Sequence, residues 1–417
     1  MPYPTYLVCH KQLTKSYRTV ALNKIQNIQR RTTILHRMGR ATSLTLETGE
    51  TSDESSISFV AISEKEADWI ERSINGNQDI LEKVVKEEME GNENDKERII
   101  HFKAVKKDLI RASFTSLSFL AIIPFFSTVY FHIDDVFRLD TITEDIVHIV
   151  FRYWWVIFLV FVVFLIAGIL FGIVRTFWKY GNYEISSDAN KIYIKKGLVE
   201  EISFSILKEK VQAIEIKQTL MKRLLRITEV KLISAGDTGE SELETNSLYP
   251  FLPNKRAYEI IHELLPEYEV EQVMERLSKK ALIARLVRPS YLWIVATLAI
   301  MYFWPSFWYV SVIIFIFMYL HRVLDFLHSG YVINNEFIQI KKGSFSTTMF
   351  MTKRKKVIEI EVLCTKWQRF FGLATIDLIN RSKPIIHTNI KDIPLHKAAS
   401  FYTWYQKRIK EISTKLE

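Results

Sequence analysis

The sequence predicts an α+β membrane protein in which three related β-domains, each a small sandwich or barrel with a C-terminal helix, are interleaved with two transmembrane helical hairpins. Three observations carry this prediction: long runs without charged residues, an internal repeat of domain length, and an apolar period of two inside each repeat. The 417 residues are 48% hydrophobic yet 25% charged, with a formal net charge of +9. Apolar and charged residues are therefore segregated into separate blocks.

Two uncharged runs predict the first hairpin. Neither Ala112–Ile133 nor Tyr153–Val174 contains an Asp, Glu, Lys or Arg residue. At about 1.5 Å per residue, a helix of either length crosses a hydrocarbon core of about 30 Å. The alternative is a buried helix of a soluble domain, which rarely stays uncharged over such a length.

A third uncharged run, Pro289–Leu320, predicts the second hairpin. It is long for one helix and short for two, and Trp304-Pro305-Ser306 is a natural break because proline disrupts a continuing helix. We favour two short spans, and a re-entrant hairpin is the alternative. Two short spans would need the flanking Arg285, Arg288 and Arg322 to snorkel outward.

The distribution of charge predicts the orientation. The loop Asp134–Val150 carries five acids and one base, whereas the segments at the other ends of the runs are rich in Lys and Arg. The positive-inside rule places this loop outside and the larger segments in the cytoplasm. We expect a multipass protein of the cell membrane with cytoplasmic β-domains.

The repeat is visible by direct alignment. Ile192–Ile233 aligns with Ile338–Ile379 at a constant offset of 146, with fourteen of 42 positions identical, including the tetrapeptide Ile-Lys-Lys-Gly at 194–197 and 340–343. The first block joins at an offset of 186. Inside a copy, alternating segments such as Val357–Val362 predict strands. The predicted C-terminal helices are Glu64–Ile74, a segment after Pro253, and Leu395–Ile412.

The repeat and the apolar runs divide the chain. The expected segments are a β-domain at 1–80, a charged linker at 81–111, a hairpin at 112–174, a β-domain at 175–265, a basic juxtamembrane segment at 266–288, a hairpin at 289–322 and a β-domain at 329–413. Lys11 aligns with Gly197, so the first copy lacks most of the hairpin Tyr183–Lys196. We expect this copy to be truncated at its N-terminus.

The repeated motif resembles that of bacterial pleckstrin-homology-like multipass membrane proteins. It runs from Lys24-Ile25-Gln26 to Arg37-Met38-Gly39, and from Lys356-Val357-Ile358 to Arg369-Phe370-Phe371-Gly372. The alignment that places Gly39 on Gly372 deletes one residue, and the second copy has Arg226 where the glycine is expected. The resemblance covers nearly the whole chain and implies three pleckstrin-homology-like domains with transmembrane pairs between them.

No motif for catalysis or cofactor binding is present in the sequence. It contains neither a Gly-x-x-x-x-Gly-Lys phosphate loop nor a His-Glu-x-x-His zinc motif. Cys9 and Cys364 are too few for a disulfide framework or a four-cysteine zinc site. We predict no enzyme, no cofactor and no metal.

Repeated basic residues are the candidate binding residues for lipid headgroups or an acidic partner. They are Lys195, Lys196, Lys210, Arg223, Lys341, Lys342, Lys353, Arg354, Lys355, Lys356 and Arg369. A structural role is the alternative for the residues that recur. The basic cluster of the third copy, which consists of Lys341, Lys342 and the run Lys353–Lys356, is expected to be exposed, because buried charges need counter-charges. Nucleic acid is not expected, because the basic residues follow the membrane ends.

These observations favour a non-enzymatic membrane scaffold. Its cytoplasmic domains would bind protein partners or the anionic lipids of the inner leaflet. The resemblance implies a role in envelope stress or in resistance to membrane-active compounds, with a related membrane protein as partner in a hetero- or homo-oligomer. The alternative is a subunit of a transporter or channel, although ionisable residues are nearly absent from the spans. A membrane enzyme lacks a candidate active site.

Overall fold

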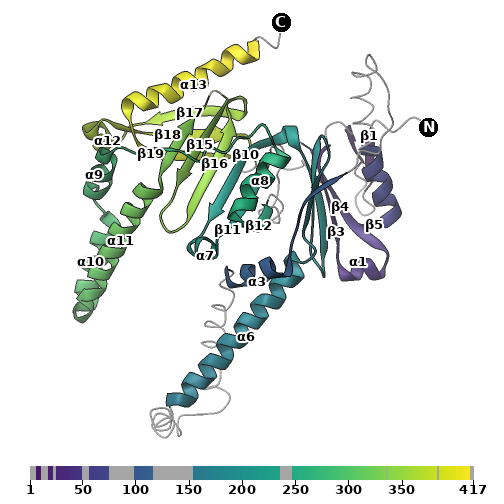
Figure 1. The fold of residues 1–417 in the computed structure, drawn as a ribbon, viewed down its shortest axis with the longest axis horizontal. Coiled ribbons are helices and arrows are strands. Elements are labelled where there is room, and N and C mark those ends of the chain that lie inside the picture. Colours follow the sequence, from purple (N-terminus) through teal and green to yellow (C-terminus); the bar gives the residue numbers. More distant parts are fainter. Residues whose placement is uncertain are drawn as a thin grey trace.

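The computed structural model describes residues 6–10, 17–21, 25–48, 56–74, 98–115, 154–234, 247–334, 336–382 and 385–413. Antiparallel sheets form the body of the molecule, and long helices project from one side of it (Figure 1). The fold is therefore sheet-rich α+β, as the sequence predicts.

The secondary structure follows the three copies of the repeat. The first copy contains β1 (Tyr6–His10), β2 (Tyr17–Ala21), β3 (Ile25–Thr32), α1 (Ile34–Met38), β4 (Ala41–Thr48), β5 (Ser56–Ser63) and a helix over residues 64–74. It is followed by β6 (Ile99–Lys103), α3 (Lys106–Thr115) and α6 (Trp154–Tyr180). The second copy contains β7 (Glu184–Ser187), β8 (Lys191–Lys196), β9 (Glu201–Leu207), the 3₁₀ turn η4 (Lys208–Lys210), β10 (Val211–Gln218), α7 (Leu220–Leu224), β11 (Ile227–Ser234), β12 (Ser247–Pro253) and α8 (Asn254–Leu264).

A short strand and the apolar helices lead to the third copy. They are β13 (Glu275–Arg276), α9 (Lys279–Val287), α10 (Tyr291–Phe303), the 3₁₀ turn η6 (Pro305–Phe307) and α11 (Trp308–His328). The third copy contains β14 (Gly330–Ile333), β15 (Phe337–Lys342), β16 (Thr347–Lys353), η7 (Arg354–Lys356), β17 (Val357–Leu363), α12 (Lys366–Phe371), β18 (Leu373–Asn380), β19 (Ile386–Pro394) and α13 (Leu395–Ser413). The second and third copies therefore have the same order of elements, which confirms the repeat.

Each of these two copies is a sandwich of two half-sheets. In the second copy, Ile194 of β8, Ile214 of β10 and Ile261 of α8 belong to one buried cluster. In the third copy, Ile338 of β15 and Phe401 of α13 are joined in the same way. Each such side chain contributes about 1.5–3 kcal/mol by leaving water, so the alternating strands are stable only when the half-sheets pack face to face.

The sheets also cross the borders between copies. One seven-stranded sheet has the order β5-β4-β3-β9-β8-β7-β6, and the other has the order β12-β11-β10-β16-β15-β14-β13. The second half of each copy is thus hydrogen-bonded, edge to edge, to the first half of the next copy. The third copy ends in the three-stranded sheet β17-β18-β19, and β1 pairs with β2 in a two-stranded sheet.

The two junctions between copies have the same register. Gln29 of β3 lies opposite Phe204 of β9, and Glu215 of β10 lies opposite Phe350 of β16. Both pairs agree with the offsets of 186 and 146 found in the sequence. The junction is therefore a repeated feature of the chain.

The turn after each short helix corrects one detail of the motif alignment. Arg40, Arg226 and Gly372 all have positive φ, of 49°, 56° and 64°. Gly39 has φ −88°, so the alignment that deletes a residue to place Gly39 on Gly372 is wrong. An arginine takes the left-handed conformation in two copies, at a cost of about 1–2 kcal/mol each.

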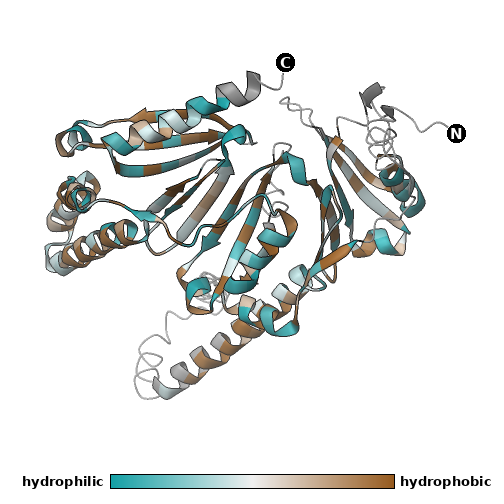
Figure 2. Cartoon of the chain, turned by 45° about the horizontal axis from the view of Figure 1, so that its top comes forward, coloured by the Kyte–Doolittle hydropathy of each residue, from teal (hydrophilic) through white to brown (hydrophobic). Residues whose placement is uncertain are grey.

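Within the part of the chain that the structure describes, three helical segments are long and apolar enough to cross a membrane: Val162–Tyr180, Lys279–Phe303 and Pro305–His328. They are largely apolar in Figure 2. The chain turns at Pro305, as the sequence predicts, and α10 packs on α11, with Trp293 Nε1 donating to the Ser311 carbonyl at 3.1 Å. Most of the run Ala112–Ile133 and the loop Asp134–Val150 lie outside the described residues.

Candidate membrane interface

A short helix follows each of the equivalent strands β3, β10 and β17. These helices, α1, α7 and α12, begin after Thr33, Thr219 and Thr365, and each threonine hydroxyl accepts a hydrogen bond from a backbone N–H of the first turn. Such capping stabilises a helix by about 1 kcal/mol, which helps so short a segment to form.

The outer faces of these helices carry apolar side chains. Met38, Leu224 and Phe370 occupy equivalent positions and are 81%, 78% and 80% exposed. Leu35 and Trp367, one turn earlier, are also exposed. Large apolar side chains that recur on a surface indicate contact with a partner or a membrane.

The short helices lie on the side from which the long apolar helices leave the body. In Figure 1, α1 and α7 face the same side as α6 and as the hairpin α10–α11. The helix α7 lies against α3, and α12 lies against α9. The repeated apolar side chains therefore gather near the predicted membrane surface.

The repeated arginine joins neighbouring copies. Arg37 lies 3.8 Å from Glu201 at the start of β9. Its equivalent, Arg223, donates to Thr347 Oγ1 at 2.9 Å at the start of β16 and approaches His328 Nε2 at 3.3 Å. Arg369 is exposed, and its side chain has no ion pair or hydrogen bond among the described residues. The structural alternative thus fits Arg223, and Arg369 remains available for binding.

The Lys-Lys pairs end strands beside a tight turn. Lys195 is paired with Glu201 at 2.7 Å, whereas Lys196 is buried with its ammonium 5.9 Å from the Phe204 ring centre. Lys341 and Lys342 are half-buried, and burial lowers the pKa of both. Lys342 also lies 3.4 Å from Asn389 Oδ1.

These pairs are close to the apolar helices. In the turn after Lys342, the Gly343 N–H donates to Asp325 Oδ1 at 3.1 Å. The Phe345 ring stacks on Phe317 of α11 at 4.9 Å. The end of β15 is therefore at the membrane side of the third copy.

The expectation that the whole run Lys353–Lys356 is exposed is wrong. Lys353 and Arg354 are buried, and of the four only Lys355 is exposed. The Lys353 ammonium is paired with Glu267 and lies 4.9 Å from the Tyr268 ring centre. The Arg354 guanidinium lies 5.8 Å from the Trp404 ring centre. A counter-charge and aromatic rings thus make burial possible.

Lys356, the last residue of the run, and Lys210 of the second copy lie at the junction of the second and third copies. The Lys356 ammonium donates to the Glu209 carbonyl at 2.5 Å, and Lys210 is half-buried in the same turn. The pKa of Lys356 is lowered by burial and by the charges of Lys355 and Lys210. Lys210 and Lys356 therefore bring like charges together, which an anion could relieve.

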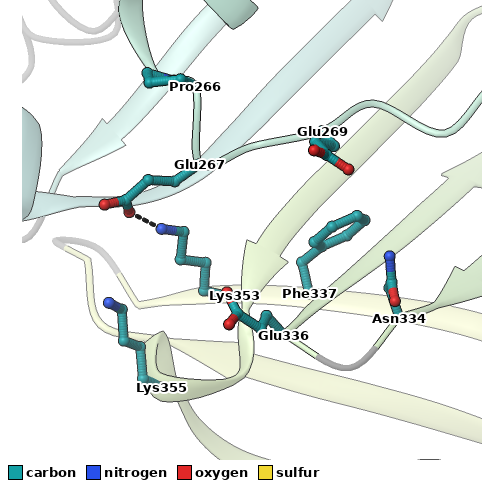
Figure 3. Close-up of a pocket in the computed structure, with 8 residues that line it drawn as sticks. All are labelled: Pro266, Glu267, Glu269, Asn334, Glu336, Phe337, Lys353 and Lys355. Atoms are coloured by element: carbon teal, nitrogen blue, oxygen red, sulfur yellow. Dashed lines mark hydrogen bonds and ion pairs between the residues drawn. The ribbon is translucent and has the colours of Figure 1, made fainter.

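The run also lies far from the membrane side. The strand β16 extends from Thr347, beside Arg223, to Lys353, which is about 20 Å at roughly 3.3 Å per residue. A hollow of about 420 Å³ lies here (Figure 3). Three carboxylates, of Glu267, Glu269 and Glu336, line it together with two lysines, Lys353 and Lys355. The lining therefore has a net negative charge, which disfavours a phosphate group.

A buried ionic network joins the apolar helices to the third copy. Arg285 of α9 donates to Asp392 Oδ2 and to Asp325 Oδ2 of α11, both at 2.9 Å. Arg288 and Gln368 donate to Asp392 Oδ1 at 3.1 and 3.0 Å. Arg285 and Asp392 are buried, and Asp392 adopts φ +66°.

The expectation that the flanking arginines snorkel outward is therefore wrong. Arg285 and Arg288 bind Asp392, and Arg322 donates to the carbonyls of Arg285 and Arg288 at 2.8 and 2.7 Å. Carboxylates and free carbonyls at the end of α9 supply partners that a bare bilayer interface lacks. Sequence reasoning did not single out Asp392, because it is the one acidic residue of β19 and no motif surrounds it.

Sequence comparison identifies the repeated domain. The family described as bacterial PH domain matches residues 11–78, 119–281 and 289–409. The chain belongs to the bacterial PH domain family. Its resemblance to the "UPF0699 transmembrane protein YdbT" of Bacillus subtilis (strain 168) is 24% identity over 408 residues, covering 93% of this chain and 80% of that protein. No solved structure matches the chain.

In this bacterial PH domain protein, the candidate residues form two groups that lie in different parts of the structure. Met38, Leu224, Phe370 and Arg369 are exposed on the short helices α1, α7 and α12, whereas Lys353 lies at the other end of β16 from Thr347, which binds Arg223. Sequence reasoning missed the apolar positions of the short helices. Their signal was present, since an apolar residue directly follows each of the repeated arginines Arg37, Arg223 and Arg369.

Proposed function

We propose that this bacterial PH domain protein is a non-enzymatic multipass scaffold whose domains lie in series on the cytoplasmic surface of the cell membrane. The observation that carries the proposal is the recurrence of an exposed apolar residue at the same position of three short helices, on the side from which the apolar helices leave. The description of the relative from Bacillus subtilis as a transmembrane protein supports the membrane location.

The short helices would dip their apolar side chains into the headgroup region. Arg40, Arg226 and Arg369 lie on or directly after these helices and would meet lipid phosphates. A basic residue near an anionic leaflet contributes about 1 kcal/mol. The basic segment around α3, with Lys106, Lys107 and Arg111, supports a cytoplasmic position for the same surface.

Depth-dependent quenching tests this placement. The full chain, with Cys9→Ser and Cys364→Ser, is reconstituted in lipid nanodiscs after a single cysteine at Met38, Leu224 or Phe370 is labelled with a fluorophore. Spin-labelled lipid should quench the label at all three positions. A label at Lys355→Cys, at the far end of β16, is the matched control and should stay bright. Equal quenching at the control and at the three positions would refute the proposal.

Lipid composition separates the two contributions. Anionic lipid should increase quenching at Phe370 relative to neutral lipid, and Arg369→Gln should remove that increase. If quenching is the same in anionic and neutral lipid, the short helices contact the membrane through their apolar side chains and do not recognise anionic headgroups.

We extend the proposal to maintenance of the cell envelope, as the resemblance implies. Cells that lack the protein should become more sensitive to membrane-active compounds. The wild-type chain should restore resistance, and a chain with Met38→Asp, Leu224→Asp and Phe370→Asp should not, although it accumulates in membranes. If cells with this triple variant are fully resistant, the apolar side chains of the short helices are not needed for maintenance of the cell envelope.

A further inference from the structure

The strand β17 has an edge that its equivalents use for pairing. In the first and second copies, β3 and β10 are each hydrogen-bonded on this edge to the next copy, through β9 and β16. Among the described residues, β17 pairs only with β18. An unpaired edge strand is a template for another chain.

The free part of β17 has defined limits. The Ile358 carbonyl accepts hydrogen bonds from Tyr405 and from Arg408 of α13. The residues that follow, from Glu359 to Leu363, are half-buried or exposed, and Val362 and Leu363 are 41% and 50% exposed. In β3 and β10, pairing to the next copy begins at Asn27 and Ala213, which are the equivalents of Glu359.

The chain also contains a strand that fits this edge. At the offset of 186, β2 is the equivalent of β9, and β9 pairs with β3 of the preceding copy. β1 pairs with β2 one residue out of the register that β8 has with β9, so the equivalence rests on β2 alone. Among the described strands, β2 pairs only with β1. In Figure 1, β1 lies at the right, near the N-terminus, whereas β17 lies at the upper left, in the third copy.

We propose that β17 of one molecule pairs, antiparallel, with β2 of a second copy of this chain. This contact gives the proposed scaffold a partner, namely a second copy of the same chain. It rests on the proposed function in one respect, which is that both copies lie on the same side of the membrane. Because each molecule presents both strands, the contact is head-to-tail and generates a ring or a row along the membrane.

The register of the two internal junctions predicts the register of the new one. It places Glu361 opposite Arg18 and Val362 opposite Tyr17, since Glu215 lies opposite Phe350 and Ile216 opposite Met349. In that register Glu361 and Arg18, which have opposite charges, would be cross-strand neighbours, and so would Val362 and Tyr17. Such cross-strand pairs stabilise sheets. Arg37 and Arg223 contact Glu201 and Thr347 across the internal junctions. The equivalent position in the first copy is Lys15, which has the same charge as Arg369, so Arg369 does not contribute to the new contact.

Disulfide cross-linking of the full chain in membranes tests the pairing. Two chains with different tags, both with Cys9→Ser and Cys364→Ser, are co-expressed, one carrying Arg18→Cys and the other Glu361→Cys. Mild oxidation should give a dimer that contains both tags. The combination of Arg18→Cys with Thr403→Cys, on the exposed face of α13, is the matched control and should give none. In a further experiment, one chain carries both Arg18→Cys and Glu361→Cys. If oxidation then gives only a disulfide within the monomer and no dimer, the proposal is overturned.

Charge exchange provides a second readout. Glu361→Arg should lower the yield of a Tyr17→Cys and Val362→Cys cross-link about two- to five-fold, as expected for loss of one cross-strand charge pair. Co-expression with Arg18→Glu on the partner should restore it. No cross-link between copies, or a cross-link of β17 only to a different protein, would refute the second copy as occupant. Lipid quenching of the short helices would be unaffected by that result, so the two proposals fail separately.

Discussion

The Arg285 guanidinium binds the Asp392 carboxylate at 2.9 Å in a position from which water is almost excluded, since both side chains are buried. Arg288 binds the other oxygen of the same carboxylate. The helix α9 is thereby fixed to the sheet β17-β18-β19. Movement of the hairpin relative to the third domain would have to separate charges in a medium of low dielectric constant.

Replacing Asp392 should loosen this attachment. Asp392→Asn leaves the Arg285 charge with only Asp325 as a counter-charge, and breaking a buried pair costs about 3–5 kcal/mol. We expect a lower thermal midpoint of the full chain in detergent and faster proteolysis between α9 and α10. Glu359→Gln, which removes an exposed carboxylate, is the control and should change neither. Equal midpoints for Asp392→Asn and wild type would show that the network does not stabilise the docking.

Lys353 should make stability depend on alkaline pH. Burial, followed by the charges of Lys355 and Lys356, lowers its pKa to about 8 from an ordinary value of 10.5. Between these values the unfolded chain binds more protons than the folded one, so this group makes stability rise with pH from about 8 to 10.5. The attraction of Glu267 opposes the shift only weakly, because that carboxylate is largely exposed.

Lys353→Met should abolish this rise. Unfolding midpoints of wild type and variant are measured in parallel from pH 7 to pH 11. The control is Lys355→Met, which removes an exposed charge and should keep most of the rise. If the difference between wild type and Lys353→Met stays constant across this range, the lysine titrates at its ordinary pKa.

The sequence predicted the repeat, the strands and the break at Pro305 because each depends on local pattern. Alternation at Val357–Val362 and the tetrapeptide Ile-Lys-Lys-Gly specify elements within one copy. It did not predict that β3 pairs with β9 or β10 with β16. Backbone hydrogen bonds make those contacts, and they leave no side-chain signature beyond the general pattern of a strand.

The candidate site was only partly predictable for a related reason. Lys353 and Arg354 look like surface residues in a basic run, yet Glu267 and Trp404, distant in sequence, make their burial possible. The exposure of Met38, Leu224 and Phe370 was equally hidden. An apolar residue in a short segment is usually part of the core, and only the fold shows which face it occupies.

The repeated Lys-Lys-Gly turn should tolerate no side chain at its glycine. Gly343 has φ +118°, and a Cβ there would lie 2.0 Å from the Ser346 carbonyl oxygen. Gly343→Ala must therefore shift the β15–β16 turn, and we expect a loss of more than about 1 kcal/mol. Gly39→Ala is the matched control, since Gly39 has φ −88° and ordinary clearance. Equal stability of the two variants in thermal unfolding would contradict the required turn geometry.

The repeated arginine should have different roles in the second and third copies. Arg223 donates to Thr347 Oγ1 across the junction of copies, and hydrogen bonds from a charged group contribute about 1.5–3 kcal/mol. Arg223→Ala should lower the thermal midpoint and expose β10 and β16 to hydrogen exchange. Arg369→Ala removes an equivalent but exposed side chain, so the midpoint should stay constant while quenching of the Phe370 label by anionic lipid declines. If Arg369→Ala destabilises the chain as much as Arg223→Ala does, the arginine is a structural element of every copy and the free Arg369 is not a lipid contact.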